Sequence, residues 1–171
     1  METFTSLYAL WKLRRCARVG RAPCVRGHVW IHGRGQVLLG DGVVLDAAHF
    51  PIELHAQEPG SRLVLGDGVY IGGGTSIEAV VSVTIGARTR VGSFTKVMDN
   101  HFHPLWGNRH FKPPSAPVVV GEDVEIGSRA IFLAGADVGN GATVRAGAVI
   151  TRRTRVRPGG TAYGLPAVVD D

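Results

Sequence analysis

Apolar residues recur at every sixth position along much of this 171-residue chain. Because an α-helix has about 3.6 residues per turn, anchors six residues apart would wander around a helix instead of lining one side of it. An even period suits a β-strand, in which alternate side chains share a face. The pattern therefore predicts an array of short strands, and its longest unbroken frame consists of Val120, Ile126, Phe132, Val138, Val144, Ile150 and Val156.

A second position follows the same six-residue rule. The fourth residue after an anchor is small or β-branched, as in Val124, Ala130, Ala136, Ala142, Ala148 and Thr154. The frame also appears upstream, at Val19, Val25, Ile31, Leu39, Leu45, Leu65, Ile71, Ile77, Ile85, Val91 and Val97. Self-similarity at a fixed period is typical of repeat proteins, so most of the chain is predicted to be one array.

Three such repeats make one coil with three short strands and three corners. Stacked coils bury the anchors and pair each strand with its counterpart in the next coil, at a spacing of about 4.8 Å. About seven coils would then form a prism roughly 34 Å tall. Glycine suits the corners, and turns are predicted at residues 40–42, 66–68 and 140–141. We expect an all-β domain over residues 19–169, from which a loop at 98–119 is extruded.

Residues 1–18 are predicted to cap the first coil, with a short amphipathic helix over residues 4–15. An uncapped prism would expose apolar side chains and unpaired strand edges. The alternative is weak association of this helix with an anionic membrane surface. The basic residues that favour this alternative are Lys12, Arg14, Arg15 and Arg18.

Composition indicates a single soluble domain. Hydrophobic residues make up 44% of the chain and aromatic residues 7%, which fits an interior of Val, Ile, Leu and Ala. We find no apolar run of about 18 residues and no basic leader at the N-terminus, so we expect a cytoplasmic protein. The two cysteines, Cys16 and Cys24, are too few for a disulfide framework and are expected to be reduced thiols.

The net charge of +5 and the pI near 9.8 favour anionic ligands. Nucleic acid is not expected, because the basic residues lack the interleaved aromatic residues of a base-stacking surface. A late cluster of arginines suits the phosphates of a nucleotide-like cofactor, although a plain solvated face is the other interpretation. This cluster comprises Arg145, Arg152, Arg153, Arg155 and Arg157.

The interruption at residues 98–119 is the segment where chemistry is most expected, because long excursions from regular scaffolds are usually functional. It contains His101, His103, His110, Asp99, Trp106 and Arg109. The His-x-His pair could supply two metal ligands, but a third suitably placed ligand is missing, so we expect no metal. A general base is the alternative, since imidazole titrates near neutral pH. Spacing alone does not separate a base from histidines that only hold loop hydrogen bonds.

Several motifs resemble a known family when they are taken in order. They are the stretch Val-Met-Asp-Asn-His-Phe-His-Pro at residues 97–104, the run of residues 116–128, Ala-Gly-Ala-Val-Ile-Thr-Arg at 146–152, and Gly-Leu-Pro-Ala at 164–167. Together they resemble the hexapeptide-repeat acyltransferases, which have a left-handed parallel β-helix. Within that family, the chain is similar to the branch of maltose, galactoside and polysaccharide O-acetyltransferases.

This resemblance implies a homotrimer with active sites between adjacent prisms and acetyl-CoA along the C-terminal coils. The left-handed winding is also an implication, because parallel strands otherwise favour right-handed crossovers. The matching catalytic residue is His103, which precedes the proline, and His101 is the reserve candidate. Candidate cofactor contacts are Ser128, Ala146, Thr151, Arg152 and Arg153, and candidate acceptor contacts are Asp99, Trp106 and Arg109.

Two positions depart from the pattern of the family. Glu125 stands where the family commonly has tryptophan, and Val168 replaces a basic residue after the Gly-x-Pro-Ala motif. We accordingly expect the cofactor to be bound differently than in the family. The carboxylate of Glu125 is interpreted either as orienting a histidine of a neighbouring subunit or as an exposed corner glutamate.

The function predicted from this resemblance is direct acetyl transfer from acetyl-CoA to a hydroxyl of a sugar or glycan, with His103 as general base. No activated serine or cysteine stands near the histidines in sequence, which argues against a covalent acyl-enzyme. Three alternatives stay open: N-acyl transfer to an amino sugar nucleotide, a non-catalytic trimeric scaffold, and a zinc lyase of the γ-carbonic-anhydrase type on the same fold.

Overall fold

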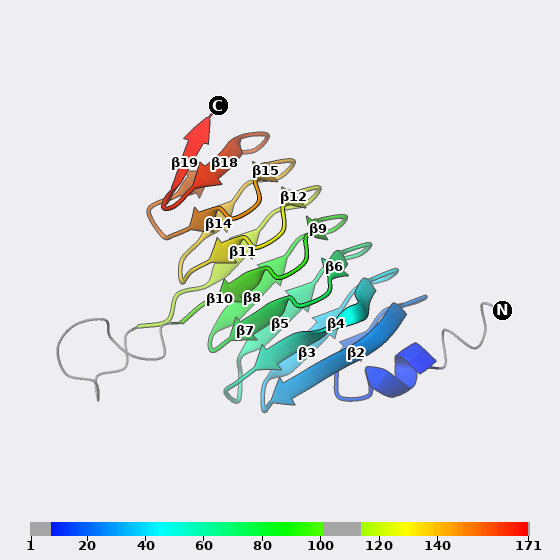
Figure 1. Ribbon diagram of the computed structural model, residues 1–171. Helices are drawn as coiled ribbons and strands as arrows, with labels where there is room; N and C mark the ends of the chain where they lie inside the picture. Colours follow the sequence, from blue (N-terminus) through cyan, green and yellow to red (C-terminus); the bar gives the residue numbers. More distant parts are fainter. Residues whose placement is uncertain (1–7, 101–113, 171) are drawn as a thin grey trace.

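The computed structural model describes residues 8–100 and 114–170, and these form a parallel β-helix. Figure 1 shows coils stacked along one axis, with a short helical segment at one end and a hairpin at the other. One face of the helix is a seven-stranded sheet with one strand from each coil, in agreement with the predicted number of coils.

Nineteen strands make up the described fold. They are β1 (Arg18–Val19), β2 (Cys24–Gly33), β3 (Gln36–Leu39), β4 (Val44–Ala56), β5 (Arg62–Leu65), β6 (Tyr70–Gly72), β7 (Ser76–Ala79), β8 (Ser82–Ile85), β9 (Arg90–Val91), β10 (Lys96–Met98), β11 (Val118–Val120), β12 (Glu125–Ile126), β13 (Ile131–Phe132), β14 (Asp137–Val138), β15 (Thr143–Val144), β16 (Val149–Ile150), β17 (Arg155–Val156), β18 (Thr161–Gly164) and β19 (Ala167–Asp170). Residues 8–12 are helical.

The strands form three faces. The first face has the order β1-β3-β5-β8-β11-β14-β17. The second face runs from β4 through β6, β9, β12 and β15 to β18, and the third runs from β4 through β7, β10 and β13 to β16. Strand β4 belongs to both, because Val44–Asp46 pair with β6 whereas Glu53–Ala56 pair with β7. All these pairings are parallel, and the antiparallel hairpin of β18 and β19 ends the helix.

The predicted anchors form the core. Each of the seven anchors from Val120 to Val156 is at most 4% exposed, and Phe132 is fully buried. The small residues four positions later are buried as well, including Ala130, Ala148 and Thr154. Upstream anchors from Val25 to Val97 are buried in the same way, while Val19 is only partly buried against the core. The interior is therefore the narrow column that the six-residue period predicts.

The corners follow the predicted turns. Residues 41–42, 67–68 and 140–141 are turns, and Gly42 and Gly68 have φ values of 65° and 66°. This left-handed conformation is costly for residues with a Cβ atom, so glycine fits there. We call the corner between the first and second faces the first corner, that between the second and third faces the second corner, and that between the third and first faces the third corner.

The described part of the N-terminal segment closes one end of the column. Ala9 and Leu13 are 0% and 1% exposed and belong to the core, whereas Trp11 is 57% exposed. Burial raises the pKa of the nearby Cys16 thiol to about 12, so this thiol stays protonated at neutral pH. Both cysteines are free. Among the described residues, no helix is long and apolar enough to cross a membrane.

Replacing Phe132 by Ala tests the central role of the column. The ring fills the middle of the core, so its loss is expected to lower the free energy of unfolding by about 3–5 kcal/mol in urea denaturation. The control is Val119→Ala, a residue of β11 that is 45% exposed, with an expected change of about 0.5 kcal/mol or less. Equal losses in the two variants would contradict the assignment of the core.

Candidate active site

The predicted catalytic loop leaves and rejoins the β-helix at the third corner. Strand β10 ends at Met98, and the chain returns at Ala116 just before β11. The amide of Ala116 donates to the carbonyl of Asp99 at 2.9 Å, so the two ends of the loop are tied together. The corner of the next coil is attached to the same place, because the Gly135 amide donates to the Ala116 carbonyl at 3.1 Å.

The contacts of the Asp99 side chain differ from those predicted. It was expected to contact the acceptor, but it is 0% exposed. Its carboxylate accepts hydrogen bonds from the amides of Val80, Val81 and Ser82 at 2.7–2.8 Å. These three backbone hydrogen bonds explain why a carboxylate is buried at this position, because buried polar groups need hydrogen-bond partners. We therefore assign Asp99 to holding the base of the loop, in place of the predicted acceptor contact.

The other predicted loop residues, His101, His103, Trp106 and Arg109, lie outside the described residues. Their roles stay predictions. Within residues 8–100 and 114–170, no group of three or more His, Cys, Asp or Glu side chains is arranged to hold a metal ion.

The predicted cofactor contacts divide between two corners. Ser128 and Ala146 lie at the second corner, in consecutive coils, and the Gly147 amide next to Ala146 donates to the Ser128 carbonyl at 3.0 Å. Thr151, Arg152 and Arg153 lie at the third corner, after β16. Four residues separate Ala146 from Thr151, and the last two of them form β16.

The three residues at the third corner lie beside the base of the loop. A Cβ atom built on Gly135 would come within 3.0 Å of the Arg152 Cβ and 3.6 Å of the Ala116 Cβ, so these three positions meet at one point. The Thr151 hydroxyl accepts from the Arg153 amide at 3.2 Å and shapes this turn. Both arginines are exposed. The structure thus places Arg152 close to Ala116 at the base of the loop, and Arg153 follows it in the same turn.

A second feature lies at the second corner, where β4 carries extra residues. In the ladder between β2 and β4, Gly27 pairs with Ala47 and Val29 with Ile52. A single residue of β2 therefore faces four residues of β4, the stretch 48–51. The extra residues, which include His49 and Phe50, stand out from the corner and form one wall of a pocket.

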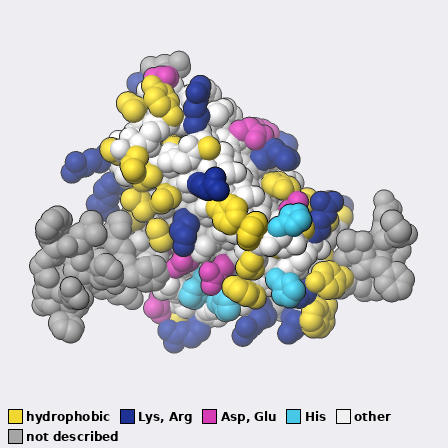
Figure 2. Space-filling view, in the orientation of Figure 1, with side chains coloured by type: hydrophobic (Ala, Val, Ile, Leu, Met, Phe, Trp, Pro, Cys, Tyr) yellow, Lys and Arg dark blue, Asp and Glu magenta, His cyan; other side chains and the backbone are white. Residues whose placement is uncertain are grey.

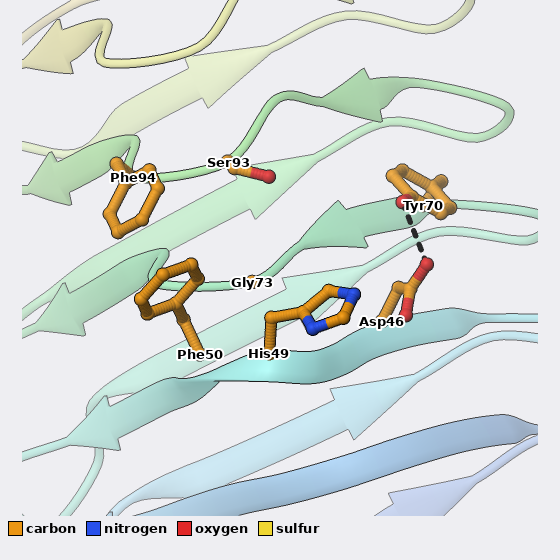
Figure 3. A pocket seen from close by; sticks show the side chains of 7 residues that line it. All are labelled: Asp46, His49, Phe50, Tyr70, Gly73, Ser93 and Phe94. Atoms are coloured by element: carbon orange, nitrogen blue, oxygen red, sulfur yellow. Dashed lines mark hydrogen bonds between the residues drawn. The ribbon is translucent and has the colours of Figure 1, made fainter.

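This pocket has a volume of about 280 Å³. Figure 3 shows the Phe50 and Phe94 rings together on one side of the pocket and the hydrogen-bonded Tyr70 and Asp46 on the other, with the His49 imidazole between the two sides. The ring centroids of Phe50 and Phe94 are 4.7 Å apart. The pocket is lined by Asp46, His49, Phe50, Tyr70, Gly73, Ser93 and Phe94, which come from three successive coils.

Glycines in the next coil make room for the pocket. A Cβ atom on Gly73 would lie 2.9 Å from the Phe50 carbonyl oxygen, and one on Gly74 would lie 2.5 Å from the Phe94 ring. Phe94 itself has a φ of 61°, which is unusual for a bulky residue. Such a conformation costs about 1–2 kcal/mol for an L-residue. Arg129, at the same position of the next coil, also has a φ of 61°, so this conformation belongs to the regular turn of the second corner, and it leaves the Phe94 ring 39% exposed.

The polar side of the pocket is a hydrogen-bonded pair. The Tyr70 hydroxyl donates to the Asp46 carboxylate at 3.1 Å, and Arg26 lies 3.6 Å from the same carboxylate. Burial, with the hydrogen bond to Asp46, raises the pKa of Tyr70, so its hydroxyl stays protonated at neutral pH. The Arg90 guanidinium lies 4.6 Å from the centre of the Tyr70 ring. The pocket thus offers aromatic faces beside groups that can donate and accept hydrogen bonds.

The two departures from the family pattern are both at the surface. The Glu125 side chain is 64% exposed and lies 3.9 Å from the Arg90 side chain. The two residues are paired between β12 and β9 in the second face. Val168 is 58% exposed and pairs with Tyr163 in the terminal hairpin. In the single chain, Glu125 is therefore an exposed glutamate of the second face.

The residues of the pocket were not predicted from the sequence, although a signal was present. Consecutive anchors Leu45 and Leu54 are nine residues apart instead of six, and Leu54 occupies the anchor position because it pairs with Ile77. This difference marks the three extra residues of the corner. The triplet of glycines at 72–74 is a second signal, since it allows neighbouring side chains to approach the backbone.

Comparison with known proteins agrees with this architecture. Residues 117–152 match the family described as bacterial transferase hexapeptide (six repeats). A stretch of 59 residues is 48% identical to 2,3,4,5-tetrahydropyridine-2,6-dicarboxylate N-acetyltransferase of Staphylococcus aureus, which covers 34% of this chain. The chain spans only 24% of the length of that curated relative.

Two solved structures share the fold over nearly the whole chain. One is AntD, an N-acyltransferase from Bacillus cereus in complex with dTDP and 3-hydroxybutyryl-CoA, with a TM-score of 0.77, 19% identity, and coverage of 100% of this chain and 90% of that one. The other is a hexapeptide-repeat acetyltransferase from Vibrio cholerae in complex with acetyl-CoA, with a TM-score of 0.66, 20% identity, and coverage of 96% and 74%. The chain therefore carries hexapeptide transferase repeats on the β-helix fold that these proteins have.

Replacing Asp99 by Asn separates a structural role from an acceptor contact. The amide cannot accept all three backbone hydrogen bonds, so the free energy of unfolding is expected to fall by about 1–3 kcal/mol. The matched control is Asp137→Asn, whose carboxylate is 53% exposed and 3.6 Å from Arg155, and which should change stability little. Unchanged stability in Asp99→Asn, measured in urea, would restore the earlier prediction of an acceptor contact.

Proposed function

We propose that the protein is an acyl-CoA-dependent acyltransferase that transfers an acetyl group to a hydroxyl of a sugar or glycan. The observation that carries this proposal is the pocket at the second corner, with aromatic and hydrogen-bonding groups on a hexapeptide β-helix. The solved structures from Bacillus cereus and Vibrio cholerae are bound to 3-hydroxybutyryl-CoA and acetyl-CoA, respectively, which supports an acyl-CoA donor. The motifs at residues 97–104 and 116–128 support the O-acetyltransferase branch.

The chemistry of the pocket suits a sugar. Phe50 and Phe94 offer apolar ring faces, against which the C–H faces of a pyranose can pack. Asp46, Tyr70 and Ser93 offer hydroxyl and carboxylate groups for the hydroxyls of the sugar. Small-molecule sites usually combine apolar walls with a small number of polar groups.

The late coils suit the donor. At the second corner, Ala146 presents no bulky side chain, so an extended cofactor can approach the backbone. At the third corner, Arg152 and Arg153 are exposed and can meet phosphates. These two corners belong to opposite ends of β16, so a cofactor that contacts both would span the third face.

The proposed reaction is a direct transfer with His103 as general base. The imidazole takes the proton of the acceptor hydroxyl, and the oxygen attacks the carbonyl carbon of the thioester. Backbone N–H groups stabilise the oxyanion that forms. When the bond between carbon and sulfur breaks, the imidazolium returns its proton to the thiolate, so that the products are the acetyl ester and free CoA.

A homotrimer would bring the parts of this site together. In one chain, the loop base with Asp99 and Ala116 lies at the third corner, whereas the pocket with Tyr70 and Phe94 lies at the second corner. The third face separates these corners. A neighbouring copy could place its own third corner against the pocket, and a ring of three copies closes this contact.

Nitrogen is the second candidate for the acceptor atom. The curated relative from Staphylococcus aureus is an N-acetyltransferase, and AntD is an N-acyltransferase bound to dTDP. The same base could take the proton from an amino group of a sugar nucleotide. Mass spectrometry of the product with alkaline treatment distinguishes the two, because an ester is cleaved by mild base and an amide is not.

Replacing His103 by Ala tests the mechanism. The loss of the general base is expected to lower the rate of acetyl transfer by about 10²–10⁴-fold, because proton transfer no longer assists the attack. The measurement is thiol release from acetyl-CoA with a panel of sugars as acceptors. Thermal shift with CoA should be the same in the variant as in the wild type, since CoA binding does not need the base.

The control is His101→Ala in the same loop. It should retain most of the activity if His103 is the base. The reverse result, an inactive His101→Ala protein beside an active His103→Ala protein, would reassign the base to His101. Full activity of both variants would refute a histidine base in this loop.

A further inference from the structure

A second hollow adjoins the pocket, on the third face. It has a volume of about 300 Å³ and shares the Phe50 and Phe94 rings with the first pocket, so the two hollows adjoin at these rings. Its residues are Trp30, Phe50, Pro51, Glu53, Gly74, Thr75, Ser76, Phe94 and Lys96. Figure 2 shows a run of hydrophobic side chains across the centre of this side of the molecule, flanked by histidine, basic and acidic side chains.

The second hollow is built on a regular ladder. Trp30 pairs with Glu53, Glu53 with Ser76, and Ser76 with Lys96, so these side chains project outward in a row over four adjacent coils. At about 4.8 Å per strand, the row from Trp30 to Lys96 is about 14 Å long. This length exceeds what a single pyranose ring can cover.

The row combines the groups that recognise sugars. Trp30 presents an aromatic face that is 49% exposed, and Phe50 is 50% exposed at the boundary with the first pocket. Glu53, Ser76 and Lys96 supply a carboxylate, a hydroxyl and an ammonium group within the same hollow. Large exposed aromatic residues gathered at one place usually mark a binding surface.

An interface between copies fits this surface less well. The fully buried centre of a protein interface is depleted of charged residues. Here Glu53 and Lys96 lie in the row itself, and His32 is 3.9 Å from Glu53. Burying these charges against another protein would be costly unless each found a partner, whereas sugar hydroxyls can donate to the Glu53 carboxylate and accept from the Lys96 ammonium group.

We propose that this hollow is a second sugar subsite, so that the acceptor is an oligosaccharide or glycan chain and not a free monosaccharide. The inference rests on the proposed function, because the reacting sugar occupies the first pocket. The shared wall of Phe50 and Phe94 lies between the reacting sugar and its neighbour. Trp30 and Lys96 then determine the preference for chain length without touching the reacting hydroxyl.

The test compares acceptors of increasing length. Mono-, di- and tetrasaccharides of galactose, glucose and N-acetylglucosamine are offered with acetyl-CoA, and kcat/KM is measured for each. In the wild type, at least one series should show a gain of about tenfold or more from mono- to disaccharide. The variants Trp30→Ala and Lys96→Gln should lose that gain and keep the monosaccharide rate, while Trp11→Ala, an exposed tryptophan that does not line the hollow, should keep both.

Binding of the same panel of sugars, measured by saturation-transfer NMR, separates this inference from the proposed function. Oligosaccharide binding that Trp30→Ala abolishes, without acetyl transfer, would retain the subsite and refute the transferase. Transfer with no gain from added sugars would refute the subsite and retain the transferase. A change in the oligomeric state of Trp30→Ala, measured by light scattering, would indicate that the hollow is an interface between copies and would refute the subsite. Neither binding nor transfer with any of these sugars would overturn both proposals.

Discussion

The in-register parallel ladder is the constraint on which the rest of the structure depends. Each strand bonds to the strand of the next coil, and each anchor must point into a column that is closed on three sides. A residue inserted within a strand would turn the following anchors outward. Extra residues can therefore be accommodated only at the corners, and both candidate sites of the chain, the insertion in β4 and the loop after β10, are found there.

The corners also decide how these features can act together. The insertion carries His49 and Phe50 at the second corner, and Asp99 fixes the start of the loop at the third. Because the ladder is rigid, neither corner can approach the other across the third face. In the proposed function, two copies of the chain therefore share the site, one with the pocket and one with the loop. The cofactor candidates divide in the same way, with Ser128 and Ala146 at one corner and Thr151 and Arg152 at the other.

The sequence predicted what is periodic. Anchors such as Ile71 and Phe132 were placed correctly, because a six-residue period has one solution that buries every anchor. Prediction failed where the period is broken. Asp99 was assigned to the acceptor, since nothing in the sequence indicates that its carboxylate meets three amides from residues 80–82, about one coil earlier. The pocket was missed because its residues come from three coils, and their proximity depends on stacking.

Complementation between two inactive variants tests the shared site most directly. One variant is His103→Ala, and the other is Ser93→Arg, which fills the pocket with a long side chain. When the two are co-expressed and purified as mixed oligomers, an intact pocket of one copy can meet an intact loop of another, so about a quarter of the wild-type activity should return if trimers assemble at random. Mixed oligomers without any activity would contradict the account, because they would mean that pocket and loop act within one chain.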